Sequence, residues 1–166
     1  MSGFPGVRDR ARLLATGRRF EDFQVGEVFE HHWGRTITES DNVAFATLTL
    51  SFTPLYFNGE YARSQGHDRL VVHPMLLFLT VFGLSVEDLS EGGGPFLGVD
   101  DLSYHRPVLV GETVYARSTV LSARASSSRP GVGIVSWRTE GLIGGTVVVD
   151  FTRSNLVRKQ GEESVL

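Results

Sequence analysis

The sequence has no cysteine among its 166 residues. This absence excludes disulfide bonds, thiolate nucleophiles and zinc sites built on cysteine ligands. A large excess of charge is also missing, since the formal net charge is −3 and the sequence pI is about 5.9. No basic stripe and no run of like charge indicates a nucleic acid or a membrane surface as a partner.

Long hydrophobic runs are missing as well. The longest one, from Met75 to Leu84, is too short to cross a bilayer. The N-terminal residues include arginines but no apolar segment of signal-peptide length, which favours a soluble cytoplasmic protein. The five histidines show no spacing typical of a zinc site, so we expect neither a metal nor another cofactor.

What the chain does contain is the composition of a folded domain. Hydrophobic residues make up 41% of the sequence and charged residues 21%, which excludes a disordered chain. The length suits one domain, and no internal repeat is visible. We predict an N-terminal arm over residues 1–19, one domain over residues 20–158 and a flexible tail over residues 159–166.

Two helical patterns lie in the first half of the domain, and the second is the most apolar stretch of the chain. In TESDNVAFATLTL, Thr38, Ser40 or Asp41 can cap a helix. Further on, in VVHPMLLF and the residues after it, nearly every position is apolar, which is typical of a helix buried on most sides. Pro74 suits its first position, because the φ of proline is helical and the N–H there has no intrahelical partner. Between the two helices lies a polar loop with one short helical turn near residues 59–63.

Strand patterns dominate the second half of the chain. After an early strand-like run over residues 28–33, four long strands are predicted over residues 96–108, 113–126, 132–143 and 146–158. Successive strands without intervening helices indicate the α+β class, with a curved antiparallel sheet wrapped around one long buried helix. Such a sheet leaves an edge open, and pairing of that edge predicts a homodimer.

Two groups of segments carry a resemblance to a known family. One group is FEDFQVGEVFEH with GRTITESDN, and the other is RPVLVGETVYARSTVL with RPGVGIVSWRTEG. Both groups resemble the MaoC-like hydratase/dehydratase family, which has the hot dog fold. The branch of methylmalyl-CoA and mesaconyl-CoA dehydratases is the most similar, and the resemblance runs from about residue 20 to residue 158. It implies an enzyme that adds or removes water across the α,β-double bond of an acyl thioester. The acyl carrier implied is coenzyme A or an acyl-carrier protein.

The resemblance also implies where the site lies. Members of the family carry a loop of the form Asp-x-Asn-Pro-x-His, and the matching loop here is SFTPLYF. Ser51 stands at the aspartate, Thr53 at the asparagine and Tyr56 at the histidine, while the proline is retained. Asn58 stands where an acidic residue often follows. The loop is therefore present, but its acid–base residues are replaced.

A second family motif, His-Gly-Met, opens the central helix, and its glycine N–H polarises the thioester carbonyl. Here His73 and Met75 match, and Pro74 replaces the glycine. Proline has no N–H, and an oxyanion donor of this kind is worth roughly 3–4 kcal/mol in the transition state. Serine is not ionised near neutral pH, and tyrosine, whose ordinary pKa is ~10, is a hydrogen-bond donor rather than a base.

From these positions we predict Tyr56 and His73 as catalytic residues. The predicted substrate-binding residues are Ser51, Thr53, Asn58, Pro74 and Met75. Four of these residues have a structural alternative. His73 can hydrogen-bond the loop and set the helix entry, Tyr56 can fill the space of the family's histidine, and Ser51 and Asn58 can simply hold the turn.

Other polar residues are weaker candidates. Asp100 or Asp101 could supply a replacement carboxylate, since strand alternation points one of them to the inner face, but a surface position is favoured. His31 and His32 are adjacent on a strand and point to opposite faces, so at most one of them faces the core.

Three functions remain open at this point. The first is a thioester hydratase/dehydratase-type lyase with a non-standard site, in which Tyr56 and His73 carry the acid–base work. The second is a repurposed hot dog enzyme that catalyses isomerisation or cyclisation in a biosynthetic pathway. The third is a non-catalytic subunit that pairs with an active homologue.

Overall fold

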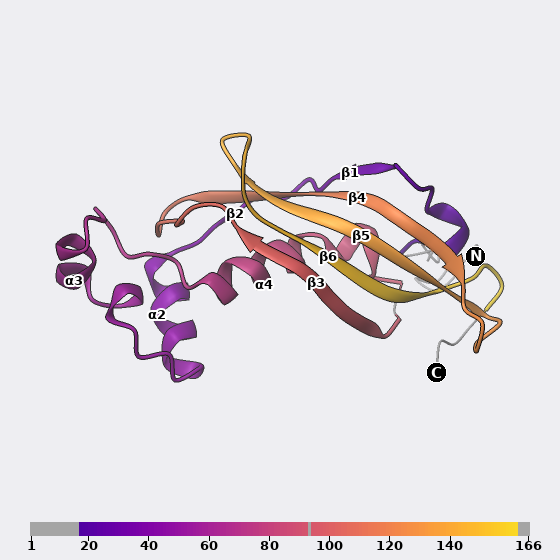
Figure 1. Cartoon of the computed structure of the whole chain (residues 1–166), viewed down its shortest axis with the longest axis horizontal. Coiled ribbons are helices and arrows are strands. Elements are labelled where there is room, and N and C mark those ends of the chain that lie inside the picture. Colours follow the sequence, from indigo (N-terminus) through magenta and orange to yellow (C-terminus); the bar gives the residue numbers. More distant parts are fainter. Residues whose placement is uncertain (1–16, 93, 163–166) are drawn as a thin grey trace, which may run out of the picture.

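The computed structural model describes residues 17–92 and 94–162. In this part of the chain, an antiparallel sheet lies over the central helix α4, and the helices α2 and α3 lie beyond one end of the sheet (Figure 1). The strands are β1 (Val28–Glu30), β2 (Arg35–Thr36), β3 (Phe96–Tyr104), β4 (Thr113–Ala125), β5 (Val132–Ile143) and β6 (Thr146–Arg158). The helices and 3₁₀ turns are η1 (Phe20–Asp22), α2 (Glu39–Leu48), η2 (Pro54–Tyr56), α3 (Gly59–Ser64), α4 (Pro74–Leu84) and α5 (Val86–Leu89).

The sheet has the order β1-β4-β5-β6-β3, and β2 pairs with β4 beside β1. All pairs are antiparallel, and β5 pairs with β6 along nearly its whole length. The predicted α+β class with an antiparallel sheet around a central helix is therefore confirmed. The strand expected over residues 28–33 ends at Glu30, and the one expected over residues 96–108 ends at Tyr104. No helix in the described part of the chain is long and apolar enough to span a bilayer.

Most of the N-terminal arm, residues 1–16, and the end of the tail, residues 163–166, lie outside the described residues. The first residues of the tail hold hydrogen bonds to the domain. The Lys159 ammonium donates to the Pro130 carbonyl at 2.8 Å, and the Gln160 N–H donates to a Glu21 carboxylate oxygen at 2.9 Å. These contacts place residues 159 and 160 against the domain.

Helix α2 begins where its sequence predicts. Of the three capping candidates, Thr38 takes the position, since its hydroxyl accepts a hydrogen bond from the Asp41 N–H at 3.2 Å. The Asp41 carboxylate accepts from the Thr38 N–H at 2.9 Å, which completes a reciprocal capping box.

The expected single long helix is wrong in one respect, because it breaks at Ser85 into α4 and α5. The Ser85 N–H and hydroxyl both donate to the Phe82 carbonyl, at 3.2 and 2.7 Å, which closes the last turn of α4. The buried Arg153 guanidinium donates to the Ser85 carbonyl at 3.3 Å and lies over the Phe82 ring. Local side-chain bonds and one buried cation from β6 therefore end the helix.

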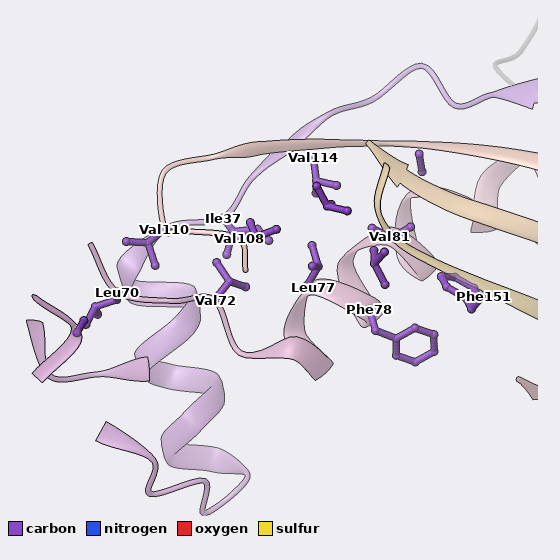
Figure 2. Close-up of a cluster of buried hydrophobic side chains, with 14 residues drawn as sticks. Ile37, Leu70, Val72, Leu77, Phe78, Val81, Val108, Val110, Val114 and Phe151 are labelled. Carbon is purple, nitrogen blue, oxygen red and sulfur yellow. The ribbon is translucent and has the colours of Figure 1, made fainter. Parts of the chain in front are cut away.

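Helix α4 buries only the face that it turns to the sheet. Leu77, Phe78 and Val81 are buried on this face, and Phe151 of β6 packs edge-on against Phe78 with ring centroids 4.9 Å apart (Figure 2). The cluster continues through valines of the neighbouring strands and loops, among them Val114 (Figure 2). This packing supplies the main hydrophobic core.

The opposite side of α4 is exposed, which corrects the expectation of a helix buried on most sides. Met75 is 42% exposed and Leu79 48%, and they lie one turn apart on the helix. Trp33 and Leu50 flank them and are 65% and 71% exposed. We call these four residues the α4 face. Apolar patches of this kind on a single chain indicate a surface that binds something.

The remaining polar candidates lie away from α4. Asp100 and Asp101 are both exposed, at a β-bulge where Asp101 has φ +54°, so neither supplies a carboxylate to the core. His31 is buried and His32 is exposed, as their alternation predicts. The His31 ring bonds Asp88 of α5 at 2.6 Å and Ser118 of β4 at 2.9 Å, which ties α5 to the sheet.

The close approach of α4 to β5 depends on Gly141. A Cβ at this position would lie 2.6 Å from a methyl of Val81 and 2.8 Å from a methyl of Val149. We expect Gly141→Ala to lower the free energy of unfolding by about 1–3 kcal/mol, because an overpacked core must shift backbone or side chains. Urea unfolding measures the change. Gly98→Ala, in a strand position with open space, serves as the matched control, and equal losses for both variants would contradict this account.

Candidate active site at the start of the central helix

The predicted site residues Ser51, Tyr56 and His73 come together at the start of α4. The His73 Nε2 and the Ser51 Oγ are 3.0 Å apart. The Tyr56 ring lies against the His73 ring with centroids 4.6 Å apart, and Phe45 of α2 lies on the imidazole with centroids 5.0 Å apart. Three segments, α2 with its following loop, η2 and α4, therefore supply one cluster.

His73 caps the helix that it precedes. Its Nδ1 accepts a hydrogen bond from the Met75 N–H at 3.1 Å, so the ring proton of the neutral imidazole lies on Nε2. Nε2–H then donates to the Ser51 hydroxyl oxygen. Burial lowers the pKa of the His73 imidazole below its ordinary value, which favours this neutral form. Both ring nitrogens are therefore engaged, and neither is a free base.

The first two positions of α4 also offer no free N–H to a thioester carbonyl. Pro74 has no N–H at the first helical position, and the Met75 N–H is bound to His73. The replacement of the family's glycine by proline thus removes one donor, and the cap made by His73 uses the next.

Asn42, in α2, was not singled out from the sequence, yet it holds this cluster together. It is completely buried, and its Nδ2 donates to the carbonyls of Tyr56 and Val71 at 2.8 and 2.9 Å. Its Oδ1 accepts from the His73 N–H at 2.7 Å. A polar residue inside an apolar helix face was the available signal, but the three partners are far away in the sequence.

Hydroxyl donors are what the cluster can offer a ligand. Within residues 17–92 and 94–162, the Ser51 hydroxyl has no acceptor for its proton, and the Tyr56 hydroxyl has no hydrogen-bond partner. A second tyrosine, Tyr104 of β3, was missed by the sequence analysis. Its hydroxyl donates to the Pro74 carbonyl at 2.9 Å, and burial, with a smaller contribution from Tyr56, raises the pKa of Tyr104.

One hollow beside the cluster is lined by His73, and another is lined by Tyr56. The one on the α4 face, of about 520 Å³, we call the His73 hollow, and the one on the sheet side, of about 420 Å³, we call the Tyr56 hollow. The His73 hollow is lined by Phe45, Thr49, Leu50, Ser51, His73, Met75 and Leu79. The Tyr56 hollow is lined by Leu55, Tyr56, Val71, Val72, Pro74, Leu77, Tyr104, His105, Arg106, Pro107 and Val108.

The lining of both hollows is largely apolar. Among the described residues, no aspartate or glutamate lines either hollow. The carboxylate of Glu112 is held by Arg106 at 2.9 Å, and that of Asp150 by His105 at 2.5 Å and Arg138 at 2.8 Å. Acids near the site are therefore occupied by ion pairs. The described residues also include no group of three or more acidic or histidine side chains that could hold a metal ion.

The other predicted site residues lie apart from the cluster. The Asn58 Oδ1 accepts hydrogen bonds from the N–H groups of Glu60 and Tyr61, both at 3.0 Å, and so caps α3. Thr53 is exposed and precedes the turn η2. Neither side chain lines the two hollows, whereas Pro74 lines one and Met75 the other.

Comparison with known proteins decides the family. The sequence profile of the mesaconyl-CoA hydratase family matches residues 1–164. The chain belongs to this family. It is 38% identical over 159 residues to the mesaconyl-CoA hydratase of Haloarcula marismortui, covering 95% of this chain and 44% of that protein. It is 30% identical over 151 residues to the β-methylmalyl-CoA dehydratase of Chloroflexus aurantiacus, covering 87% of this chain and 41% of that protein.

The fold is the hot dog fold of the MaoC-like proteins. A Mycobacterium tuberculosis protein with a double hot dog fold superposes with a TM-score of 0.73 at 24% identity, over 89% of this chain and 46% of that one. The chain thus spans less than half the length of the curated mesaconyl-CoA hydratases it matches.

The hydrogen bonds of His73 predict the protonation state and the tautomer of its imidazole. We expect ¹⁵N NMR of the ring to show a neutral form with the proton on Nε2, and a midpoint of titration below about 6.5. Because the folded form has the lower pKa, the contribution of His73 to stability is complete above about pH 6.5 and falls as the pH drops below that value. An Nδ1–H tautomer would contradict the capping bond.

Proposed function

We propose that the chain binds an acyl thioester of coenzyme A and takes part in its hydration or dehydration. The observation that supports this most is the cluster of Ser51, Tyr56 and His73 at the start of α4, in a chain of the mesaconyl-CoA hydratase family. The curated relatives are named for mesaconyl-CoA and β-methylmalyl-CoA, so a short methyl-branched acyl-CoA is the first substrate to test.

Tyr56 is the proposed donor to the thioester carbonyl. Addition of water to the β-carbon of an enoyl thioester places negative charge on the carbonyl oxygen, and a positioned donor stabilises that charge. The Tyr56 hydroxyl is unengaged among the described residues and borders the Tyr56 hollow. It can therefore replace the N–H that Pro74 lacks.

Ser51 and His73 are proposed to act as a pair. His73 donates to the Ser51 oxygen, which leaves the Ser51 proton free to orient water or a substrate oxygen in the His73 hollow. To accept the proton of the attacking water, the His73 Nδ1 must first release the Met75 N–H. Pro74 and Met75 shape the hollows, and substrate binding by Thr53 and Asn58 stays a prediction.

A second candidate follows from the missing base. Among the described residues, both His73 nitrogens are engaged and no carboxylate lines the hollows, so a second hot dog unit could supply the base while this unit supplies donors and a binding surface. The α4 face favours this candidate, because its exposed apolar side chains border the His73 hollow. The second unit is a second copy in a homodimer or an active homologous chain.

The donor role of Tyr56 predicts a selective loss of activity. We expect Tyr56→Phe to lower kcat/KM for hydration of mesaconyl-CoA by roughly 100- to 1,000-fold, since the phenyl ring keeps the packing and removes the donor. Loss of enoyl absorbance follows the reaction. Tyr61→Phe, on the exposed side of α3, is the matched control. If Tyr56→Phe abolishes a rearrangement of the acyl group without any hydration, the isomerase or cyclase alternative holds instead.

The α4 face predicts self-association or pairing. We expect Leu79→Glu to shift the chain to a smaller species in light scattering, because a buried carboxylate opposes a packed apolar interface. Leu121→Glu, an equally exposed leucine on β4, should leave the mass unchanged. A wild-type chain that stays monomeric and still turns over mesaconyl-CoA would exclude the second candidate.

Cell fractionation tests the predicted cytoplasmic location.

A further inference from the structure

Asn42 connects three separate parts of the site through one side chain. Its two amide protons go to the carbonyls of Tyr56 and Val71, and its oxygen receives the His73 N–H, at 2.7–2.9 Å. These partners lie 14, 29 and 31 residues away in the sequence. The side chain is completely buried, so water has no access to replace any of the three bonds.

No other side chain of this size has the same combination of groups. The three bonds use two donors and one acceptor in fixed directions, which the primary amide of asparagine provides. A carboxylate has no proton for either carbonyl, and the repulsion between its charge and the two carbonyl oxygens displaces it from the His73 N–H as well. An alkyl side chain would leave these three backbone groups buried without a hydrogen bond. Each such group lowers the stability of the folded state.

The hydrogen bonds of Asn42 also position the two candidate catalytic side chains, those of His73 and Tyr56. Fixing the His73 N–H holds this residue in its capping conformation, with φ −57° and ψ 127°, in which its Nδ1 accepts the Met75 N–H. That bond places the ring proton on Nε2, toward Ser51. Fixing the Tyr56 carbonyl holds η2 against α2, so that the phenol ring lies on the imidazole.

We infer that Asn42 is the positioning residue of this site: it sets the tautomer of His73 and the place of Tyr56 without touching the substrate. This inference rests on the proposed function, because it concerns the residues assigned there. A displacement of about 1 Å in such groups can cost roughly 100-fold in rate, so the effect on turnover is expected in kcat rather than in KM.

The test compares Asn42→Asp with Asn155→Asp. Asn155 is a buried asparagine of β6 and so matches Asn42 in burial, but it makes none of the contacts at the start of α4. We expect the first variant to lose the single Nε2–H tautomer in ¹⁵N NMR of His73, and to lose roughly 100-fold in kcat with KM changed less than threefold. The control should keep the wild-type His73 spectrum.

The outcomes separate this inference from the proposed function. If Asn42→Asp keeps the wild-type His73 tautomer, the positioning role is overturned, whatever the activity. If the tautomer changes but the wild-type protein hydrates no enoyl-CoA, the positioning role stands and the proposed function fails. Should Asn42→Asp not fold, Asn42→Ser, which retains one small donor, carries the same comparison, and an unchanged His73 spectrum in it overturns the role.

Discussion

The buried amide of Asn42 is the interaction on which the candidate site depends. It joins α2, the turn η2 and the start of α4, three segments that otherwise meet mainly through apolar contacts. Apolar contacts tolerate small slides, whereas a hydrogen bond in the interior has a narrow range of distance and direction. One side chain therefore gives the loop and the helix start a defined mutual position.

Pro74 has opposite effects on the fold and on the chemistry. Its fixed φ suits the first turn of α4, and the helix forms there with His73 as its cap. The same residue leaves the helix start without its first N–H, and the cap uses the second. Among the described residues, Ser51 and Tyr56 offer free hydroxyl donors, the Tyr104 hydroxyl is bound to the Pro74 carbonyl, and both ring nitrogens of His73 are engaged. Binding and polarising a carbonyl is the chemistry this arrangement supports most directly.

The exposed side of α4 connects these observations with the length of the relatives. Helix α4 is apolar all round, yet one sheet covers only one side of it. The curated mesaconyl-CoA hydratases are more than twice as long as the matched region, and a similar solved structure contains two hot dog folds in one chain. A second unit over Met75 and Leu79 would also enclose the His73 hollow, so the same surface links assembly with the site.

Local patterns in the sequence were sufficient for the four long strands, except the end of the first, for a helix start among Thr38, Ser40 and Asp41, and for the helix that starts at Pro74. Each of these depends on neighbours a few residues away. The matched motifs also singled out Ser51, Tyr56 and His73, which the structure brings together. The break at Ser85 and the roles of Asn42 and Tyr104 depended on partners 14 to 68 residues distant, such as Arg153 and Pro74. Only the tertiary structure decided these, since a hydrogen bond between distant segments leaves no periodic trace in the chain.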